Sequence, residues 1–222
     1  MIQKNNIFTV AIAGGIASGK TTITSMFESL GIKIIKADHH SKLVINKPEI
    51  IKTLYHKFGE CVLSNQNKIN RKVLRKIIIS NFALRMWIIE FLHPIIINSI
   101  NYSIASIDSS LHPYVLVEVP LLNSKTIKYY PYFKKIIFVK APMNLRLKRI
   151  MTRDLQSFES ACLIIRSQIL SNEKRLKEDY TIYNLSSLNF LKKQVLSIDL
   201  KIRSIIRSRR LVNFYTSRKI IC

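Results

Sequence analysis

The stretch Thr9-Val-Ala-Ile-Ala-Gly-Gly-Ile-Ala-Ser-Gly-Lys-Thr-Thr22 decides the fold. It begins with small and β-branched apolar residues, which indicate a buried strand. Gly14 and Gly15 end that strand, and the residues from Thr22 to Leu30 favour a helix that stops at Gly31. A strand, a glycine-rich loop and a helix in this order predict the first unit of an α/β fold.

The loop carries the spacing Gly14-x-x-x-x-Gly19-Lys20-Thr21, which is the P-loop pattern. Its glycines let backbone N–H groups turn inward and form a nest for phosphate oxygens at a helix N-terminus. The lysine adds a charge for the β- and γ-phosphates, and the Thr21 hydroxyl can ligate Mg²⁺. A chance glycine turn would not also supply the strand and the helix, so we expect a nucleotide phosphate site. Its expected residues are Gly14, Gly15, Ala17, Ser18, Gly19, Lys20, Thr21 and Thr22.

The composition bounds the class of protein. A chain of 222 residues is one domain or a core with insertions, and 48% apolar residues exclude disorder. The net charge of +23 has two explanations, nucleic-acid binding or a genome-wide bias toward Lys, Ile and Asn. The basic residues are dispersed and become dense only from Lys201 to Lys219, which favours the bias.

Three further features of the sequence favour a cytoplasmic protein, which we expect. No unbroken apolar run approaches the roughly 18 residues that span a bilayer. The first residues show no apolar leader with a cleavage site. Cys61, Cys162 and Cys222 are far apart and lack the spacing of metal ligands, so we expect reduced thiols. Since the sequence has no unbroken apolar run of spanning length, we also expect no membrane partner.

Two acidic residues stand near the ends of predicted strands. Residues 32–37 form the second predicted strand, and Asp38 follows it, on the edge where ligands of parallel sheets bind. A helix cap is the other role open to Asp38. Glu118 lies near the end of the apolar strand 113–120, where it can hold Mg²⁺ through water or take part in a buried salt bridge.

The remaining segments predict a helical insertion and a lid. Residues from about 48 to 106 favour helices, with a long helix interrupted at His93-Pro94. A strand at 135–140 precedes a helix that carries Arg146, Arg149 and Arg153 on one face. Such a stripe is often only a solvated face, but beside a nucleotide site it favours a lid over the phosphates. A second helix runs to Lys177.

The predicted fold is therefore α/β, with a central parallel five-stranded sheet flanked by helices. Its last strand is Tyr180–Tyr183, and a long basic helix from about residue 187 closes the chain. We assign residues 1–47, 107–140 and 178–222 to the nucleotide-binding core. Residues 48–106 form the acceptor-binding insertion and residues 141–177 the lid.

The motifs in this order resemble those of the dephospho-coenzyme A kinase family, over nearly the whole chain to about Asn184. The residues that carry the resemblance are Gly14–Thr21, Ala37-Asp38, Phe58-Gly59, Arg71, His93-Pro94-Ile95-Ile96, Val119-Pro120-Leu121-Leu122, Arg149–Asp154, Gln168, Asp179-Tyr180 and Asn184. The chain departs from the family pattern at three positions. Lys36 replaces the first acid of an Asp-Ala-Asp motif, Tyr183 replaces the usual Asp before Asn184, and Glu118 stands where Asp is common.

The resemblance implies a P-loop kinase that transfers the γ-phosphate of ATP to the ribose 3′-hydroxyl of dephospho-coenzyme A. Asp38 would orient or deprotonate that hydroxyl, and Lys20, Arg149 and Mg²⁺ would stabilise the transferring group. Arg71 and His93 would hold the acceptor, and Thr21 and Glu118 the metal. The expected partners are ATP and dephospho-coenzyme A, and the expected state is a monomer that needs no nucleic acid.

Two other functions remain open from the sequence. Another P-loop kinase for a small hydroxyl or nucleotide acceptor would have the same loop and a different insertion. A basic, nucleotide-dependent nucleic-acid-binding protein would show nucleic-acid affinity with a steep salt dependence.

Overall fold

A computed structural model of the chain describes residues 7–120, 122–123, 126–170, 177–185 and 187–218. Leu121, Cys222 and residues 171–176, where the second lid helix is predicted to continue, lie outside these residues, and Lys177, its predicted end, is described and is not helical. The chain divides into two compact units, one made of Met1–Ile35 and Ile104–Cys222 and the other of Lys36–Ser103. The finer division into core, insertion and lid stays a prediction.

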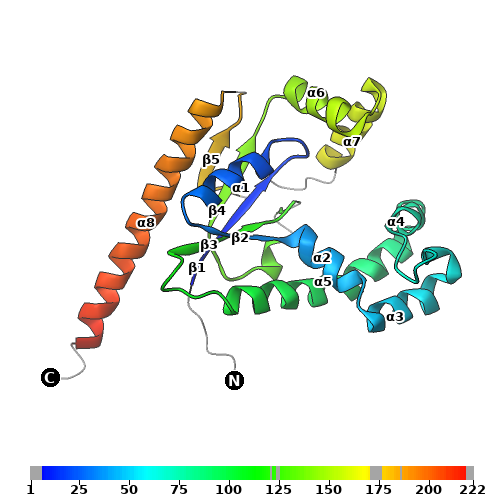
Figure 1. Cartoon of the computed structure of the whole chain (residues 1–222), viewed down its shortest axis with the longest axis horizontal. Coiled ribbons are helices and arrows are strands. Elements are labelled where there is room, and N and C mark those ends of the chain that lie inside the picture. The colour runs from blue at the N-terminus through cyan, green and yellow to red at the C-terminus, as the bar shows by residue number, and fades with distance from the viewer. Residues whose placement is uncertain (1–6, 121, 124–125, 171–176, 186, 219–222) are drawn as a thin grey trace. The chain divides into compact units, whose positions relative to one another are not determined.

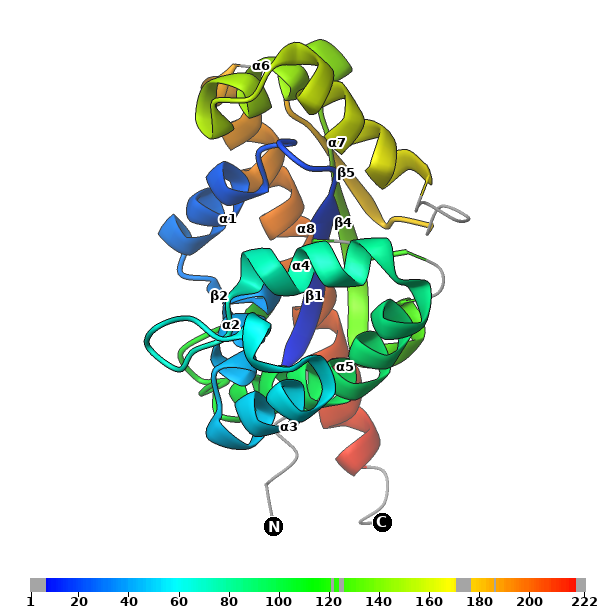
Figure 2. The ribbon, with the colours of Figure 1, turned by 90° about the vertical axis from the view of Figure 1, so that its right-hand side faces the viewer.

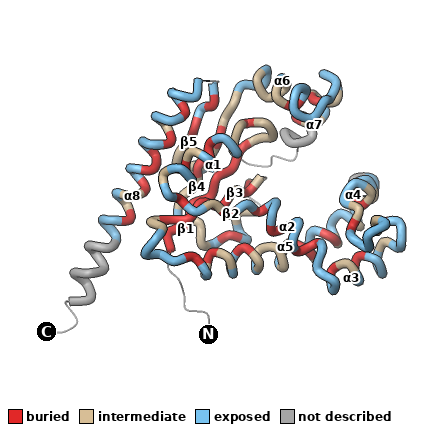
Figure 3. Tube along the Cα trace, viewed as in Figure 1, coloured by how far each residue is buried: buried red, intermediate tan, exposed pale blue. Residues whose placement is uncertain are grey.

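The first unit is built on a five-stranded parallel sheet, which confirms the predicted fold class (Figure 1). Its strand order is β2-β3-β1-β4-β5, so the P-loop strand β1 is central. The strands are β1 (Phe8–Gly14), β2 (Lys33–Lys36), β3 (Tyr114–Glu118), β4 (Phe133–Lys140) and β5 (Tyr180–Tyr183). All seven residues of β1 are buried, as the apolar sequence of that strand predicts (Figure 3).

The helices α1 (Lys20–Ser29) and α8 (Leu188–Arg218) pack on each other and against the sheet. Alternate residues of the strands meet apolar residues of these helices in one core. Its fully buried members include Val10, Ile12, Phe27, Leu116, Ile137, Ile182 and Ile202. The described part of the first unit also contains η2 (Ile127–Tyr129), α6 (Met143–Asp154) and α7 (Phe158–Leu170), of which α6 and α7 pack together (Figure 2).

A buried polar network joins this core to α8. The Tyr114 hydroxyl donates to Asp199 Oδ1 over 2.9 Å, and Arg203 Nε donates to Asp199 Oδ2 over 2.8 Å. Arg203 Nη2 also donates to the Leu30 carbonyl at the end of α1. Because the buried carboxylate has both a hydroxyl and a guanidinium as partners, its desolvation is offset. The network fixes α8 against β3 and α1.

The second unit is helical within its described residues. Its elements are α2 (Ala37–Ile45), α3 (Pro48–Phe58), η1 (Glu60–Val62), α4 (Arg71–Ser80) and α5 (Phe82–Ala105, whose last two residues belong to the first unit). They share a core that includes Val44, Leu54, Val62, Leu74 and Leu92. His40 is buried, and its Nδ1 lies 2.8 Å from Ser99 Oγ, which ties α2 to α5.

The helix α5 differs from the prediction because it continues through Pro94. Proline removes one helical donor, but Ile95 and Ile96 still pack on the core of the second unit and hold the helix in register. By length and composition alone, α5 could also cross a membrane, with a mean hydropathy of 1.3 and 22% of that window buried. Helices of soluble proteins pass the same test, and the expectation of no membrane partner stays a prediction.

Candidate active site

The glycine-rich loop joins the carboxyl end of β1 to α1. Gly14 has φ +158°, and a Cβ there would lie 2.6 Å from the Val139 carbonyl oxygen, so only glycine fits beside β4. Gly19 has φ +92°, and a Cβ at this residue would clash with the side-chain amide of Asn184. The loop therefore has the close-packed glycine geometry that the P-loop pattern predicts.

Ala17 lies in the same loop with φ +57°, the left-handed region that favours glycine. Next to it, Ser18 is buried, and its Oγ has no hydrogen-bond partner among the described residues. Lys20 is half-buried, and its Nζ donates to the carbonyl oxygens of Gly14 over 2.9 Å and Gly15 over 3.3 Å. The ammonium group therefore lies over the loop. Thr21 and Thr22 are exposed in the first turn of α1.

Two arginines of α6 reach the loop. Arg146 Nε donates to the Ile16 carbonyl over 2.9 Å, and Arg149 Nη1 donates to the Ala17 carbonyl over 3.1 Å. Burial lowers the pKa of the Arg146 guanidinium, because a charged group there has lost part of its hydration. The spacing in the sequence places both arginines on one face of the helix, and the structure brings both to the P-loop.

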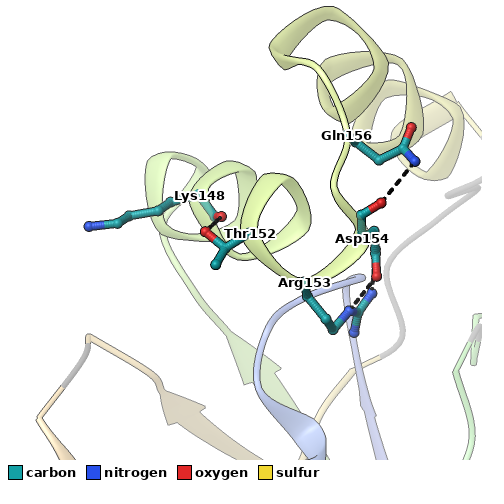
Figure 4. A network of polar contacts seen from close by, with 5 residues as sticks. All are labelled: Lys148, Thr152, Arg153, Asp154 and Gln156. Carbon is teal, nitrogen blue, oxygen red and sulfur yellow. Dashed lines mark hydrogen bonds and ion pairs between the residues drawn. The ribbon is translucent and has the colours of Figure 1, made fainter.

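Arg153, which we expected on the same face, does not contact the loop in any hydrogen bond among the described residues. It pairs with its neighbour Asp154 through two hydrogen bonds of 2.7 and 2.8 Å, and its side chain is 62% exposed (Figure 4). An adjacent acid in the last turn thus competes for this arginine. The lid contribution seen here comes from Arg146 and Arg149.

Asn184 completes the group around the loop, a role that does not follow from its sequence context, where only the family resemblance singles it out. It is buried just after β5, its Nδ2 donates to the Ser18 carbonyl over 2.8 Å, and its Oδ1 accepts from Arg149 Nη2 over 3.1 Å. Like Asp38, Asn184 is a polar residue that directly follows a strand of a parallel sheet. Because ligands bind at the carboxyl edge of such a sheet, this position could have indicated a site residue.

Glu118 ends β3 beside the P-loop strand. It is half-buried and pairs in register with Ile12 of β1, two residues before Gly14. Thr21 lies in the first turn of the helix that follows the loop. Groups of three or more His, Cys, Asp or Glu that could hold a metal ion are absent from the described residues. Mg²⁺ in phosphotransferases needs only one or two protein oxygens, because phosphates and water supply the rest. The hydroxyl and the carboxylate fit that demand.

The residues expected to bind the acceptor lie in the second unit. Asp38 is exposed in the first turn of α2, and the N-cap of this helix is Lys36, so Asp38 is not the cap. Arg71 begins α4, where the Asn70 side chain caps the helix. Arg71 and His93 line one cavity of about 580 Å³, and burial lowers the pKa of the His93 imidazole. Asp38 is not among its lining residues.

This glycine loop, on the central strand of a parallel sheet and contacted by lid arginines, defines the protein as a P-loop kinase. The family model of dephospho-CoA kinase matches residues 8–189. A dephospho-CoA kinase of Legionella pneumophila (strain Paris) is 35% identical over 190 residues, which cover 85% of this chain and 92% of that protein. The chain belongs to the dephospho-CoA kinase family.

Solved structures agree with this assignment. A dephospho-CoA kinase from Campylobacter jejuni has a TM-score of 0.64 and 29% identity, and the match covers 88% of this chain and 97% of that one. A Thermus thermophilus protein has a TM-score of 0.73 at 22% identity, with the same shares covered, which supports the fold. The family carries out the last step of coenzyme A biosynthesis, so the chain is an ATP-dependent phosphotransferase.

Proposed function

We propose that this chain transfers the γ-phosphoryl group of ATP to the ribose 3′-hydroxyl of dephospho-coenzyme A through the residues described above. The bond from the γ-phosphorus to the β-phosphate bridge oxygen breaks, and a bond to the 3′-oxygen forms. ADP leaves, and the hydroxyl proton passes to a carboxylate. The observation that carries the proposal is the set of cationic groups, from Lys20, Arg146 and Arg149, that donate to carbonyls of one P-loop.

The phosphate side of the reaction rests on these donors. A neutral carbonyl is a weaker partner for a cation than a phosphate oxygen, so ATP would draw the ammonium of Lys20 and the guanidinium of Arg149 onto its phosphates. There they would stabilise charge on the transferring group, which is usually the largest contribution to phosphoryl transfer. The buried Ser18 hydroxyl adds a further donor within the loop.

Thr21 and Glu118 are our candidates for holding Mg²⁺, the threonine directly and the glutamate through water. When bound with ATP, Mg²⁺ neutralises charge on the β- and γ-phosphates. Hard oxygen ligands of this kind suit Mg²⁺ better than a softer transition metal.

The acceptor side rests on the second unit. Asp38 is exposed in the first turn of α2, so its carboxylate is accessible to a hydroxyl. It would orient the 3′-hydroxyl and accept its proton. Arg71 is an exposed cation suited to an acceptor phosphate, and His93 shares its cavity. The chain would act as a cytoplasmic monomer, without nucleic acid or membrane.

The test is a coupled assay of ADP release with dephospho-coenzyme A, with adenosine monophosphate and with no acceptor. We expect turnover with dephospho-coenzyme A to exceed both others by at least about 10²-fold, the size of discrimination that positioned groups provide. Equal turnover with adenosine monophosphate would favour a different small-molecule kinase. Turnover that needs only ATP and nucleic acid, and that falls steeply with salt, would favour the nucleic-acid hypothesis.

A further inference from the structure

Arg146 of α6 lies against Gly15 of the P-loop. A Cβ at Gly15 would lie 2.7 Å from Arg146 Nη2, 2.8 Å from Cζ and 3.1 Å from Nη1, which are the nearest atoms outside the neighbouring residues. The φ angle of Gly15 is not in the left-handed region, so its backbone conformation does not itself require glycine. The guanidinium of Arg146 is therefore the group that a side chain at this position would displace.

Side-chain donors hold three consecutive carbonyls of the same loop. The pairs are Arg146 Nε to Ile16 over 2.9 Å, Arg149 Nη1 to Ala17 over 3.1 Å and Asn184 Nδ2 to Ser18 over 2.8 Å. The peptide between Ile16 and Ala17 is trans, so its C=O and N–H point in opposite directions. A donor that fixes the Ile16 carbonyl therefore also fixes the direction of the Ala17 N–H.

Ala17 needs such support because its backbone is left-handed, with φ +57°. A residue in this region keeps its conformation only where the surrounding contacts hold it. Arg146 holds the peptide before Ala17, and Arg149 holds the peptide after it. The two arginines thus support the strained residue from both sides.

We propose that Arg146 is a positioning residue, which holds the Ile16 carbonyl so that the Ala17 N–H faces the phosphates of ATP. The missing side chain of Gly15 provides the space for its guanidinium. When ATP draws Arg149 onto its phosphates, Arg146 is the arginine that stays with the loop backbone. The inference rests on the proposed function for its nucleotide, ATP, and adds a coupling between Gly15 and Arg146 that the P-loop pattern does not predict.

Apolar contacts also hold the lid helices on the loop. Ile16 and Ala17 pack on a cluster formed by the fully buried residues Ile150 of α6 and Ala161 and Ile165 of α7. These contacts do not depend on charge. A substitution at position 146 therefore changes the hydrogen bond to the loop and leaves the lid docked.

The first experiment measures ATP affinity by calorimetric titration without acceptor, and then KM for ATP and kcat with dephospho-coenzyme A as the acceptor. Arg146→Ala should raise Kd and KM for ATP by about tenfold, the size of one hydrogen bond from a charged group. Since the loop N–H binds the phosphates in the ground state and the transition state alike, kcat should change by less than about threefold. A fall in kcat as large as the rise in KM would show that Arg146 acts on the transferring group, and would overturn the proposal.

Arg146→Gln is the conservative variant. Glutamine Nε2 is as many bonds from the backbone as arginine Nε, so a neutral side chain can still donate to the Ile16 carbonyl. It should recover most of the ATP affinity that Arg146→Ala loses. If it binds ATP as weakly as Arg146→Ala does, the charge matters and the bond does not, and the proposal fails.

Lys148→Ala is the matched control, because it removes an exposed cation from the same helix. It should leave Kd, KM and kcat unchanged. A loss of ATP affinity equal to that of Arg146→Ala would show that the general positive charge of α6 attracts ATP, and the positioning role would be wrong.

Gly15→Ala tests the space for the guanidinium. The added methyl group would push away the flexible end of the Arg146 side chain, so ATP affinity should fall by about tenfold, as in Arg146→Ala. Because both changes remove the same bond, Gly15→Ala/Arg146→Ala should be about as weak as either single variant. Gly15→Ala/Arg146→Gln keeps the donor without the atoms that clash, so it should bind ATP more tightly than Gly15→Ala alone. Additive losses, about 100-fold in the double alanine variant, would contradict the coupling.

The readouts separate this inference from the proposed function. The titrations need no acceptor, so they measure the coupling even if dephospho-coenzyme A is not phosphorylated, a result that would refute the proposed function alone. Parent turnover with dephospho-coenzyme A together with additive losses of ATP affinity would refute the inference alone. If circular dichroism shows that Gly15→Ala does not fold, the comparison of Arg146→Gln with Arg146→Ala still decides the role of Arg146.

Discussion

The Asn184 side chain donates to the Ser18 carbonyl across 2.8 Å, and so joins the end of β5 to the P-loop. The Oδ1 atom of the same side-chain amide accepts a hydrogen bond from Arg149 Nη2. One buried amide thus holds both the loop and a lid arginine. Its loss would remove one hydrogen bond from the Ser18 carbonyl and one from the Arg149 guanidinium.

We therefore expect Asn184→Ala to lower kcat/KM for ATP by about 10- to 100-fold, the equivalent of one or two buried hydrogen bonds. Asn184→Asp keeps the acceptor for Arg149 but cannot donate to Ser18, so KM for ATP should still rise. Steady-state kinetics at varied ATP measures both, and Asn189→Ala, an exposed asparagine at the start of α8, is the control. Parent-like KM values in both Asn184 variants would show that the amide does not position the loop.

Lys20→Ala should abolish turnover and leave the fold intact. The ammonium donates to the carbonyls of Gly14 and Gly15, and Lys20 is not a member of the apolar core of the first unit, so circular dichroism should match the parent. Lys33→Ala removes an exposed lysine from β2 and should keep full activity. Appreciable kinase activity in Lys20→Ala would contradict the P-loop assignment.

Asp38→Asn should lower turnover by about 10²-fold or more, the range for loss of a positioned base. The amide keeps the size of the side chain and removes its charge. ATP affinity should barely change, because we assign Asp38 to the acceptor. The measurement is single-turnover phosphoryl transfer, so that the chemical step is observed. A rate within a few-fold of the parent would move the catalytic role to another residue.

Ala17→Gly should stabilise the protein. Ala17 has φ +57°, and a left-handed backbone costs an L-residue about 1–2 kcal/mol, part of which glycine recovers. We expect the free energy of unfolding to rise by up to about 1 kcal/mol in urea titrations. Ala13→Gly, in the buried strand β1, is the control and should destabilise. A loss of stability in Ala17→Gly would show that the loop conformation is not strained.

Stability should fall in mild acid. Burial lowers the pKa values of His40 and His93 below the ordinary value of 6.5, so the unfolded chain binds more protons than the folded one in that range. The histidine contribution is therefore fully present above pH 6.5 and is lost as the pH falls through the lowered values. Urea titrations between about pH 8 and pH 5 should show the decline. His40→Asn, whose amide takes the place of Nδ1 beside Ser99, should flatten this decline in stability, and an unchanged slope would show that His40 does not contribute to it.

The sequence predicted the sheet and the P-loop well because both follow from local rules. The apolar residues of β1, the glycine spacing and the polar start of α1 all favour one geometry. The continuity of α5 was missed because proline usually ends a helix, whereas here packing of the following isoleucines on the core outweighs the lost hydrogen bond. Helical spacing placed three arginines on one face, but it could not show that Asp154 would take Arg153 from the loop.

The strand order also determines when the P-loop can form during synthesis. β1 is made first, but its two neighbours begin only at Tyr114 and Phe133. Until the ribosome has completed both, this apolar strand leaves the exit tunnel with two unpaired edges. Since distant pairings also close slowly, the nascent chain passes through a long interval in which the loop has no strand to hold it. A chaperone that binds extended apolar segments would find its site in Phe8–Gly14 during this interval.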